Sequence, residues 1–450
     1  MDRPIQALSA VSLPVLALSL GLAMPALGQC PAEPAYLARR CPSPANPYRR
    51  RHDCTSKRFD SVAETLTRDW AGFRTDLSDQ GITPTLSYTA QFMRNASGGQ
   101  QLGSTYAGQL NGAINWDLQR LLSVPGLSLY MSSTWATGRD MSARYVGNAF
   151  EVENAFAVFS DDSYLSLQEL YFQESLLDGA LVVAAGRLAP GNTFATLPVV
   201  ANYLNGGINA NPGALPINDG SFAASPPGVE WGGQLTYDVT PVIQLAAGLF
   251  NTQSDAAAGA DHGANFALQQ GNSGALGVAQ VSYLYNQGPG ETGPQGEYTL
   301  GAMYNSGRFA SISNPNSTPN GLYQIYALFQ QMVYQEGGSG SQQGLTLWGE
   351  AAFSPTPSRS PMPYSLGGGL SYQGLISGRA NDILSVGAIY GAFSDYLPQT
   401  TGETVIEANY QINLTPWLAI TPDVQYVINP GGSNSLKDAT VVGAQLSVTF

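Results

Sequence analysis

Few side chains in this sequence have the chemistry that an enzyme needs. The chain has two histidines, His52 in an Arg-rich stretch and His262 in a Gly- and Ala-rich stretch, and a serine triad would have to be built on one of them. The adjacent carboxylates Asp161 and Asp162 could suggest glycoside hydrolysis, but neighbours on a loop more often only bind water. We therefore expect no catalytic residue, no cofactor and no enzymatic activity.

The three cysteines all lie near the start of the chain. Cys30, Cys41 and Cys54 fall in a Pro- and Arg-rich segment, and none occurs later. Two of them could pair in an oxidising compartment, but the sequence does not indicate which. A zinc site that adds His52 is conceivable, yet the spacing fits no standard finger. We expect no metal site.

Polar side chains at every second position of apolar stretches are a far more frequent pattern. Glu407, Asn409 and Gln411, for example, alternate with Ala408 and Tyr410. Many of these polar residues are amides, which donate and accept hydrogen bonds at once, so a row of them can bind polar solutes weakly. The residues that we expect to line such a pathway are Asn111, Asn115, Arg187, Glu230, Gln234, Glu407, Asn409, Gln411, Asp423 and Gln425.

The elements that must position these residues are β-strands, because the alternation has period two from residue 82 to residue 450. Alternation alone fits a soluble sandwich as well as a transmembrane barrel. The connections between sixteen candidate strands separate the two folds. Long ones, such as 137–164 and 189–228, alternate with tight turns, such as Thr415-Pro416. We therefore predict an all-β fold, a 16-stranded antiparallel transmembrane β-barrel over 82–450.

The composition agrees with this fold class. Charged residues make up only 11% of the chain, glycine occurs 51 times, and the formal net charge is −13. A helical cytosolic enzyme would have more Lys and Glu. Nucleic acid is excluded as a partner, because phosphate contacts need clustered cations.

The N-terminal region divides into three predicted segments. Residues 1–28 have the charge, the apolar stretch and the small-residue cleavage site of a signal peptide. Alternatives are a transmembrane anchor, which Pro14 disfavours, and a lipoprotein attached at Cys30. Residues 29–58 then form a Pro-, Arg- and Cys-rich periplasmic extension. Apolar residues at helical spacing predict an amphipathic helix over 59–81.

Three segments together resemble the carbohydrate-selective porin (OprB-type) family, and the likeness runs from about Trp70 to Phe450. Two departures are Ala71 and Phe73, within the family's Trp-Gly-Gly-Leu-Arg segment. The segments are Asp69-Trp-Ala-Gly-Phe-Arg74, Gly186-Arg-Leu-Ala-Pro-Gly-Asn-Thr-Phe-Ala195, and the stretch 407–432 with Asn413-Leu-Thr-Pro-Trp-Leu418.

The resemblance implies a barrel in the bacterial outer membrane that lets sugars, above all glucose-like monosaccharides, diffuse into the periplasm. Its partners are then sugars as solutes and outer-membrane lipid. A general or structural outer-membrane barrel and an outer-membrane hydrolase are the alternatives. The resemblance leaves open whether the protein is a monomer or a homotrimer.

The longest connection, 189–228, is expected to fold into the lumen as the constriction loop. Arg187, directly before it, is the cationic candidate for that constriction, since a guanidinium can donate to two vicinal hydroxyls. Glu230, Glu407 and Asp423 facing a narrow lumen predict a pore that is neutral to mildly cation-preferring. Asn192-Thr193 stands where the family often has acidic residues.

Overall fold

The fold was analysed in a computed structural model. The predicted signal peptide, the segment 29–58 with its cysteines, and the first residues of the predicted helix lie outside the described residues. The structure describes residues 65–154, 163–209, 211–222, 229–252, 262–264, 266, 274–288, 290–397 and 401–450.

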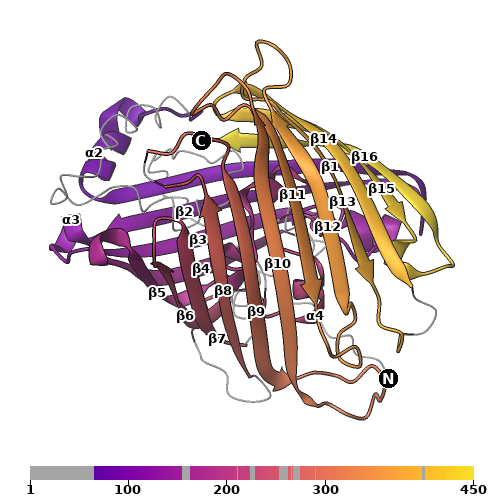
Figure 1. The fold of residues 1–450 in the computed structure, drawn as a ribbon. Helices are drawn as coiled ribbons and strands as arrows, with labels where there is room; N and C mark the ends of the chain where they lie inside the picture. Colours follow the sequence, from indigo (N-terminus) through magenta and orange to yellow (C-terminus); the bar gives the residue numbers. More distant parts are fainter. Residues whose placement is uncertain are drawn as a thin grey trace, which may run out of the picture.

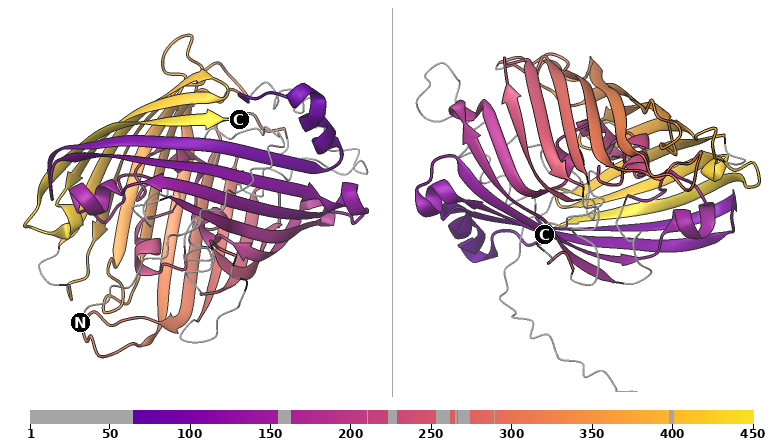
Figure 2. Two further views of the ribbon diagram at one scale, coloured as in Figure 1. Left: turned by 180° about the vertical axis from the view of Figure 1, so that it is seen from behind. Right: turned by 90° about the horizontal axis from the view of Figure 1, so that it is seen from below.

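The described residues form a closed antiparallel barrel of sixteen strands in which each strand pairs with its neighbours in sequence and β1 pairs with β16 (Figures 1 and 2). The predicted fold class is confirmed. The strands are β1 Ile82–Gly99, β2 Gly103–Asp117, β3 Leu127–Gly138, β4 Tyr164–Leu176, β5 Leu181–Leu188, β6 Glu230–Asp238, β7 Ile243–Asn251, β8 Ala275–Tyr285, β9 Gly296–Arg308, β10 Asn320–Gln335, β11 Gly344–Phe353, β12 Tyr364–Gln373, β13 Ile383–Ala392, β14 Gly402–Thr415, β15 Leu418–Ile428 and β16 Lys437–Thr449.

The two faces of each strand follow from the period of two. In β9, Tyr298, Leu300 and Tyr304 are exposed, whereas Thr299 and Met303 between them are buried. Successive side chains of a strand point to opposite faces of the sheet. The exposed apolar residues therefore form the outer surface that faces lipid, and the buried ones point into the barrel.

The connections differ in length at the two rims. At one rim they are short, such as α3 Leu118–Leu122 with its following turn and the turn at 416–417. At the other rim the connections 139–163, 189–229 and 252–274 are long. In outer-membrane barrels the short turns face the periplasm and the long loops face the exterior, which orients this barrel.

The N-terminal helix is shorter than the segment 59–81 that its periodicity indicates. A 3-10 turn, η2 Trp70–Gly72, precedes helix α2 Phe73–Asp79. Trp70 and Ala71 have φ values of 50° and 59°, and Gly72 has a φ of 96°. Left-handed residues of this kind interrupt a right-handed helix, so α2 begins only at Phe73. Among the described residues, no helix has the length and the hydropathy to cross a membrane.

The segment before α2 lies beside the end of the last strand (Figure 1). Leu66 N donates to Thr449 O at 2.7 Å. Arg74 is buried, and its guanidinium donates to Phe450 O at 3.1 Å and stacks over the Trp70 ring at 4.5 Å. The two ends of the described chain are thus joined at the short-turn rim.

Candidate functional site

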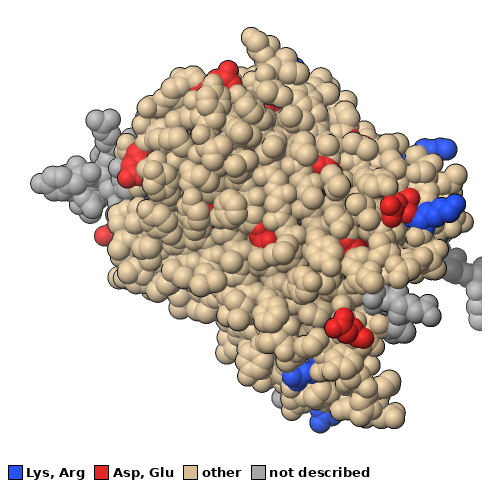
Figure 3. Space-filling view, turned by 45° about the vertical axis from the view of Figure 1, so that its right-hand side comes forward, with Lys and Arg blue, Asp and Glu red and all other residues tan. Residues whose placement is uncertain are grey.

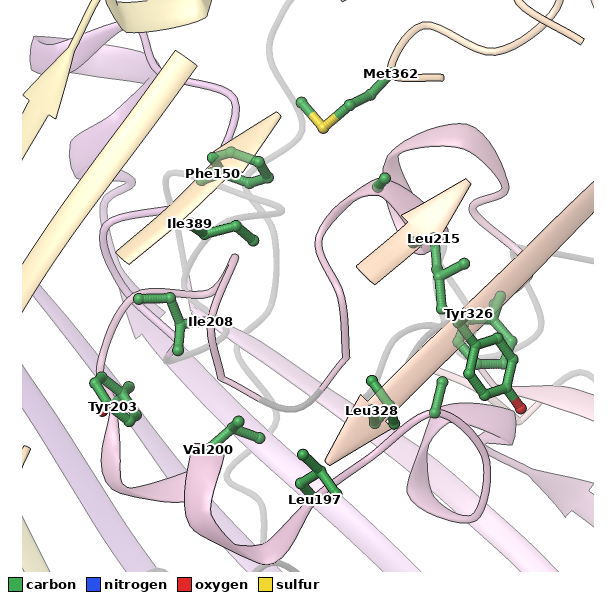
Figure 4. Close-up of a cluster of buried hydrophobic side chains, with 14 of the residues drawn as sticks. Phe150, Leu197, Val200, Tyr203, Ile208, Leu215, Tyr326, Leu328, Met362 and Ile389 are labelled. Carbon is green, nitrogen blue, oxygen red and sulfur yellow. The ribbon is translucent and has the colours of Figure 1, made fainter. Parts of the chain in front are cut away.

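The connection between β5 and β6 lies inside the barrel. It contains the short helices η6 Pro190–Asn192, η7 Pro198–Asn202 and α4 Ala214–Asn218. Its apolar side chains pack on inward-facing residues of the strands, such as Tyr326 and Leu328 of β10 (Figure 4). The loop residues buried in this cluster include Phe194, Leu197, Val200, Tyr203, Leu204, Ile208, Leu215 and Phe222.

Strands β14 and β15 hold the same loop by hydrogen bonds. The Glu407 carboxylate accepts from two consecutive backbone amides, Leu204 N at 2.7 Å and Asn205 N at 2.9 Å. Gln425 Oε1 accepts from Asn205 Nδ2 at 3.0 Å. Glu407 and Gln425 are fully buried and face each other across β14 and β15. Because a carboxylate that accepts two N–H donors binds strongly, this pair fixes the loop at residues 204 and 205.

Two further predicted residues, Asn409 on β14 and Asp423 on β15, lie beside Glu407 and Gln425. We call these four side chains the polar wall. Asn409 Nδ2 donates to Asn202 O at 3.0 Å and to Glu407 Oε1 at 2.6 Å. Asp423, opposite Asn409 in the register, accepts from Gln425 at 3.0 Å. The structure therefore brings together four of the residues that the alternation indicated, and it places the β5–β6 connection directly on three of them.

The other predicted residues lie apart from this group. Asn111 and Asn115 are half-buried on β2, and Asn111 accepts from Thr134 Oγ1 at 2.7 Å. Gln411 donates to Asn413 Oδ1 at 3.1 Å. Gln234 on β6 donates to Thr193 Oγ1 at the start of the loop at 2.8 Å, and Glu230 on the same strand is fully buried.

Arg187 is placed differently from the expectation of a cation in the constriction. It is fully buried, and its guanidinium donates to the backbone carbonyls of Leu167, Gln168 and Gly263. It also lies 5.8 Å from the centre of the Phe266 ring. The donors that could bind vicinal hydroxyls are thus used on the backbone of β4 and on Gly263.

Several residues that contact the loop were not among the candidates. Gln280 and Gln330 accept from Ala195 N and Val199 N at 3.0 Å each. Gln324 accepts from Asn218 Nδ2 at 3.1 Å. These glutamines occupy inward-facing positions of β8 and β10, Gln324 buried and the other two half-buried, so the same period of two could have selected them. Nothing in the local sequence indicates which loop amide each one meets.

A second connection, 139–163, also enters the interior in its described part. Glu403 at the start of β14 accepts from Ala149 N at 2.8 Å and Phe150 N at 2.9 Å. Glu153 accepts from Thr105 Oγ1 at 2.9 Å. The described part includes the π-helical turn η3 Ser142–Val146. Both inserted connections are therefore anchored on buried carboxylates.

Carboxyl groups within these connections have raised pKa values. Burial raises the pKa of Glu153 to about 7, against the opposing effect of its hydrogen bonds with Thr105 and Met141. Burial, and then the negative charge of Asp140, raises the pKa of Glu151 to about 8. Both carboxyls therefore keep their protons to a higher pH in this connection than they would in water.

Comparison with known proteins agrees with this geometry. The model of the carbohydrate-selective porin, OprB family, matches residues 101–450. The chain belongs to this family. The protein is therefore a sugar channel of the bacterial outer membrane and not an enzyme.

The relatives are distant in sequence but match over nearly their whole lengths. Porin B of Pseudomonas aeruginosa is 23% identical over 432 residues, which covers 87% of this chain and 92% of that protein. The putative porin QuiX of Acinetobacter baylyi is 22% identical over 424 residues, covering 86% and 93%. The high-pH structure of OprB from Pseudomonas putida superposes with a TM-score of 0.78 at 21% identity, covering 86% of this chain and 99% of that one. The resemblance of the sequence to the OprB-type family is confirmed.

Proposed function

We propose that this porin admits glucose-like monosaccharides by passive diffusion past the connection 189–228, which acts as the constriction. The observation that carries the proposal is the position of residues 189–209 and 211–222, which lie within the barrel and are bonded to strands on opposite sides of it. A loop held from two sides narrows the lumen at a fixed place. Solutes are then selected by width and by hydrogen bonding.

The inner face of the barrel supplies hydrogen-bonding groups for a hydroxylated solute. Among the predicted residues, Asn115 on β2 and Gln411 on β14 are half-buried and therefore accessible. Their amides can accept from or donate to sugar hydroxyls. Diffusion requires contacts that replace water but stay weak enough for release, which a series of single hydrogen bonds provides.

Liposome swelling tests the proposal. Proteoliposomes are diluted into isotonic solutions of a hexose, a disaccharide and a neutral amino acid of similar size to the hexose. We expect the hexose to enter several-fold faster than either of the other two. Equal rates for the hexose and the amino acid would support a general diffusion barrel instead.

The ion preference of the pore depends on the carboxylates that face its interior. Glu230, Glu407 and Asp423 all point into the barrel, and Arg187 uses its donors on backbone carbonyls. We propose a pore that is neutral to mildly cation-preferring, with a preference that fades as salt screens the charges. Reversal potentials under a salt gradient measure it, and strong anion selectivity would contradict it.

The interior contains a large apolar cluster around the inserted loop. Single-channel recording tests whether the pathway past this cluster is open, because a blocked barrel would show no discrete conductance. Both a monomer and a homotrimer are compatible with the pathway, because each barrel encloses its own lumen. The proposed signal peptide, 1–28, predicts a mature protein that starts at Gln29.

A further inference from the structure

Two tyrosines lie side by side on the inner face of the barrel, in the half nearer the short-turn rim. Tyr130 of β3 and Tyr171 of β4 are direct partners in the strand register. Their ring centres are 5.1 Å apart, and the ring planes are tilted by 32°. Both side chains are half-buried. The two rings therefore form one aromatic surface across neighbouring strands.

The strand register fixes the direction in which these rings point. Tyr130 alternates in phase with the buried Thr134 of the same strand and out of phase with the exposed Trp135. On β4, Phe172 follows Tyr171 and is 52% exposed on the lipid side. The register shift between these strands lies beyond the pair, toward the long-loop rim, and its extra residue is in β4. Both tyrosines therefore point into the barrel.

Two amide side chains flank the rings. Asn115 of β2 lies opposite Tyr130, and Gln173 occupies the next inward position of β4 after Tyr171. Both amides are half-buried, and neither bonds to a residue that the structure describes. The Tyr171 hydroxyl likewise has no hydrogen-bond partner among those residues. Groups that donate and accept hydrogen bonds are thus available beside the aromatic surface.

The pair lies on the periplasmic side of the connection 189–228. Glu169, two residues before Tyr171, accepts from Ala189 N at 3.2 Å and from Asn192 Nδ2 at 3.3 Å. From Glu169, strand β4 continues toward the short-turn rim. Tyr171 also packs against the apolar cluster around the connection, which holds its ring in place. A solute that has passed the connection therefore meets the two rings next.

Aromatic pairs on the outer surface have different surroundings. In the face that Figure 3 shows, uncharged residues cover most of the area, and Lys and Arg lie toward the lower and right-hand edges. Outward pairs such as Tyr283 and Tyr298, with ring centres 6.3 Å apart, are 42% exposed and face lipid. Tyr130 and Tyr171 instead face the aqueous interior, where an aromatic surface can contact a solute.

We propose that Tyr130 and Tyr171 form a stacking site for the pyranose ring of a hexose, whose hydroxyls bond to Asn115 and Gln173. The site rests on the proposed sugar pathway and adds the place where the sugar ring is held. A hexopyranose with equatorial hydroxyls has axial C–H groups on the faces of its ring, which suit an aromatic surface, and hydroxyls at its edge, which suit amides. An amino acid of similar size has no such ring face. Contacts of this kind are weak enough for release.

The test measures the uptake of labelled glucose into proteoliposomes over a range of glucose concentrations, which gives the half-saturating concentration. The variants are Tyr130→Leu/Tyr171→Leu, which removes both rings, and Tyr130→Phe/Tyr171→Phe, which keeps them. Phe172→Leu removes a ring from the outer face of the same strand and is the matched control. We expect the Leu variant to raise the half-saturating concentration roughly two- to tenfold for each ring removed.

We expect the Phe variant and the control to match the unaltered protein. Sorbitol is an open-chain polyol without a ring, so the Leu variant should take it up as the unaltered protein does, and this shows that the barrel is folded and open. An unchanged half-saturating glucose concentration in the Leu variant, or an equal rise in the Phe variant, would overturn the stacking site. Failure of the proposed function is distinct, because it appears in the unaltered protein as equal rates for the hexose and the amino acid.

Discussion

Two sides of the barrel hold the same inserted loop by different mixtures of interactions: the polar wall on β14 and β15, and an apolar wall on β10 and β11. Strands β14 and β15 present Glu407, Asn409 and Gln425, which bond to the loop backbone and to Asn205. Strands β10 and β11 bond to the loop through Gln324 and Gln330, but their main contribution is large apolar side chains, among them Leu328, which pack on its buried face. Hydrogen bonds have a preferred direction, whereas apolar packing has almost none. The polar wall therefore sets where the loop lies, and the apolar wall supplies most of the free energy that keeps it there.

Deleting part of the inserted loop, which both walls hold, should have the largest effect on conductance and selectivity. Deletion of residues 205–222 takes away α4 and Asn205, one of the two residues whose backbone amides bond to Glu407. We expect a several-fold higher single-channel conductance and the loss of discrimination between hexose and disaccharide in liposome swelling. An unchanged conductance would show that the loop does not narrow the pathway.

Weakening the apolar wall comes next. Leu328→Ala removes a buried side chain, 4% exposed, from the cluster on which the loop packs. Substitutions of this kind cost about 2–5 kcal/mol because a cavity remains. We expect a lower unfolding temperature in detergent and faster proteolysis of the loop. Leu300→Ala, on the outer face of β9, is the matched control and should leave loop proteolysis unaltered.

Weakening the polar wall should lower the free energy of unfolding by less than Leu328→Ala does, but it should change the position of the inserted loop by more. Glu407→Gln keeps the size of the side chain but places an amide NH2 group against a backbone N–H that now bonds to a carboxylate oxygen. A buried donor without an acceptor costs about 1–3 kcal/mol. We expect altered sugar selectivity with a small change in unfolding temperature. Gln331→Ala removes an amide from the outer face of β10, where it bonds to Tyr298, and should leave selectivity unaltered.

A change of pH should have the smallest effect, and this effect should be confined to the connection 139–163 that contains Glu151. The pKa of Glu151 in the docked connection is about 8, above its usual 4.5, so the docked form retains a proton that a released loop loses. Docking is therefore strongest below about pH 5 and weakens as the pH rises to about 8. We expect more current noise at pH 9 than at pH 6. Glu151→Gln should reduce this difference, leaving the part due to Glu153, whose pKa is about 7, and Glu291→Gln in the connection between β8 and β9 should preserve it in full.

Much of the barrel was predictable because it depends on local pattern. The period of two assigned Glu407, Asn409 and Gln425 to the inner face, and the sorting of long and short connections gave the closed barrel. The contacts within the interior were not predictable, since they join residues far apart in the chain. Nothing near Glu407 in the sequence indicates that its partners are the amides of Leu204 and Asn205.

Arg187 shows a different limit. Its position before the longest connection indicated a cation in the constriction, but the neighbours Val183 and Ala185 share its strand face and lie away from the buried Val182 and Ala184. The alternation along β5 thus places Arg187 on the outer side, where Gly263 and Phe266 contact it. The position of a residue in the chain was a weaker guide than its parity within the strand.

The contact between Arg74 and Phe450 has a consequence for the order of folding. The two residues are 376 positions apart in the chain, and the contact joins α2, which precedes β1, to the residue that follows β16. Closing so long a segment of chain is unfavourable in entropy until the strands between are paired. Arg74 can therefore reach Phe450 only after the ring of strands is complete, so this contact forms last and separates a finished barrel from an open sheet.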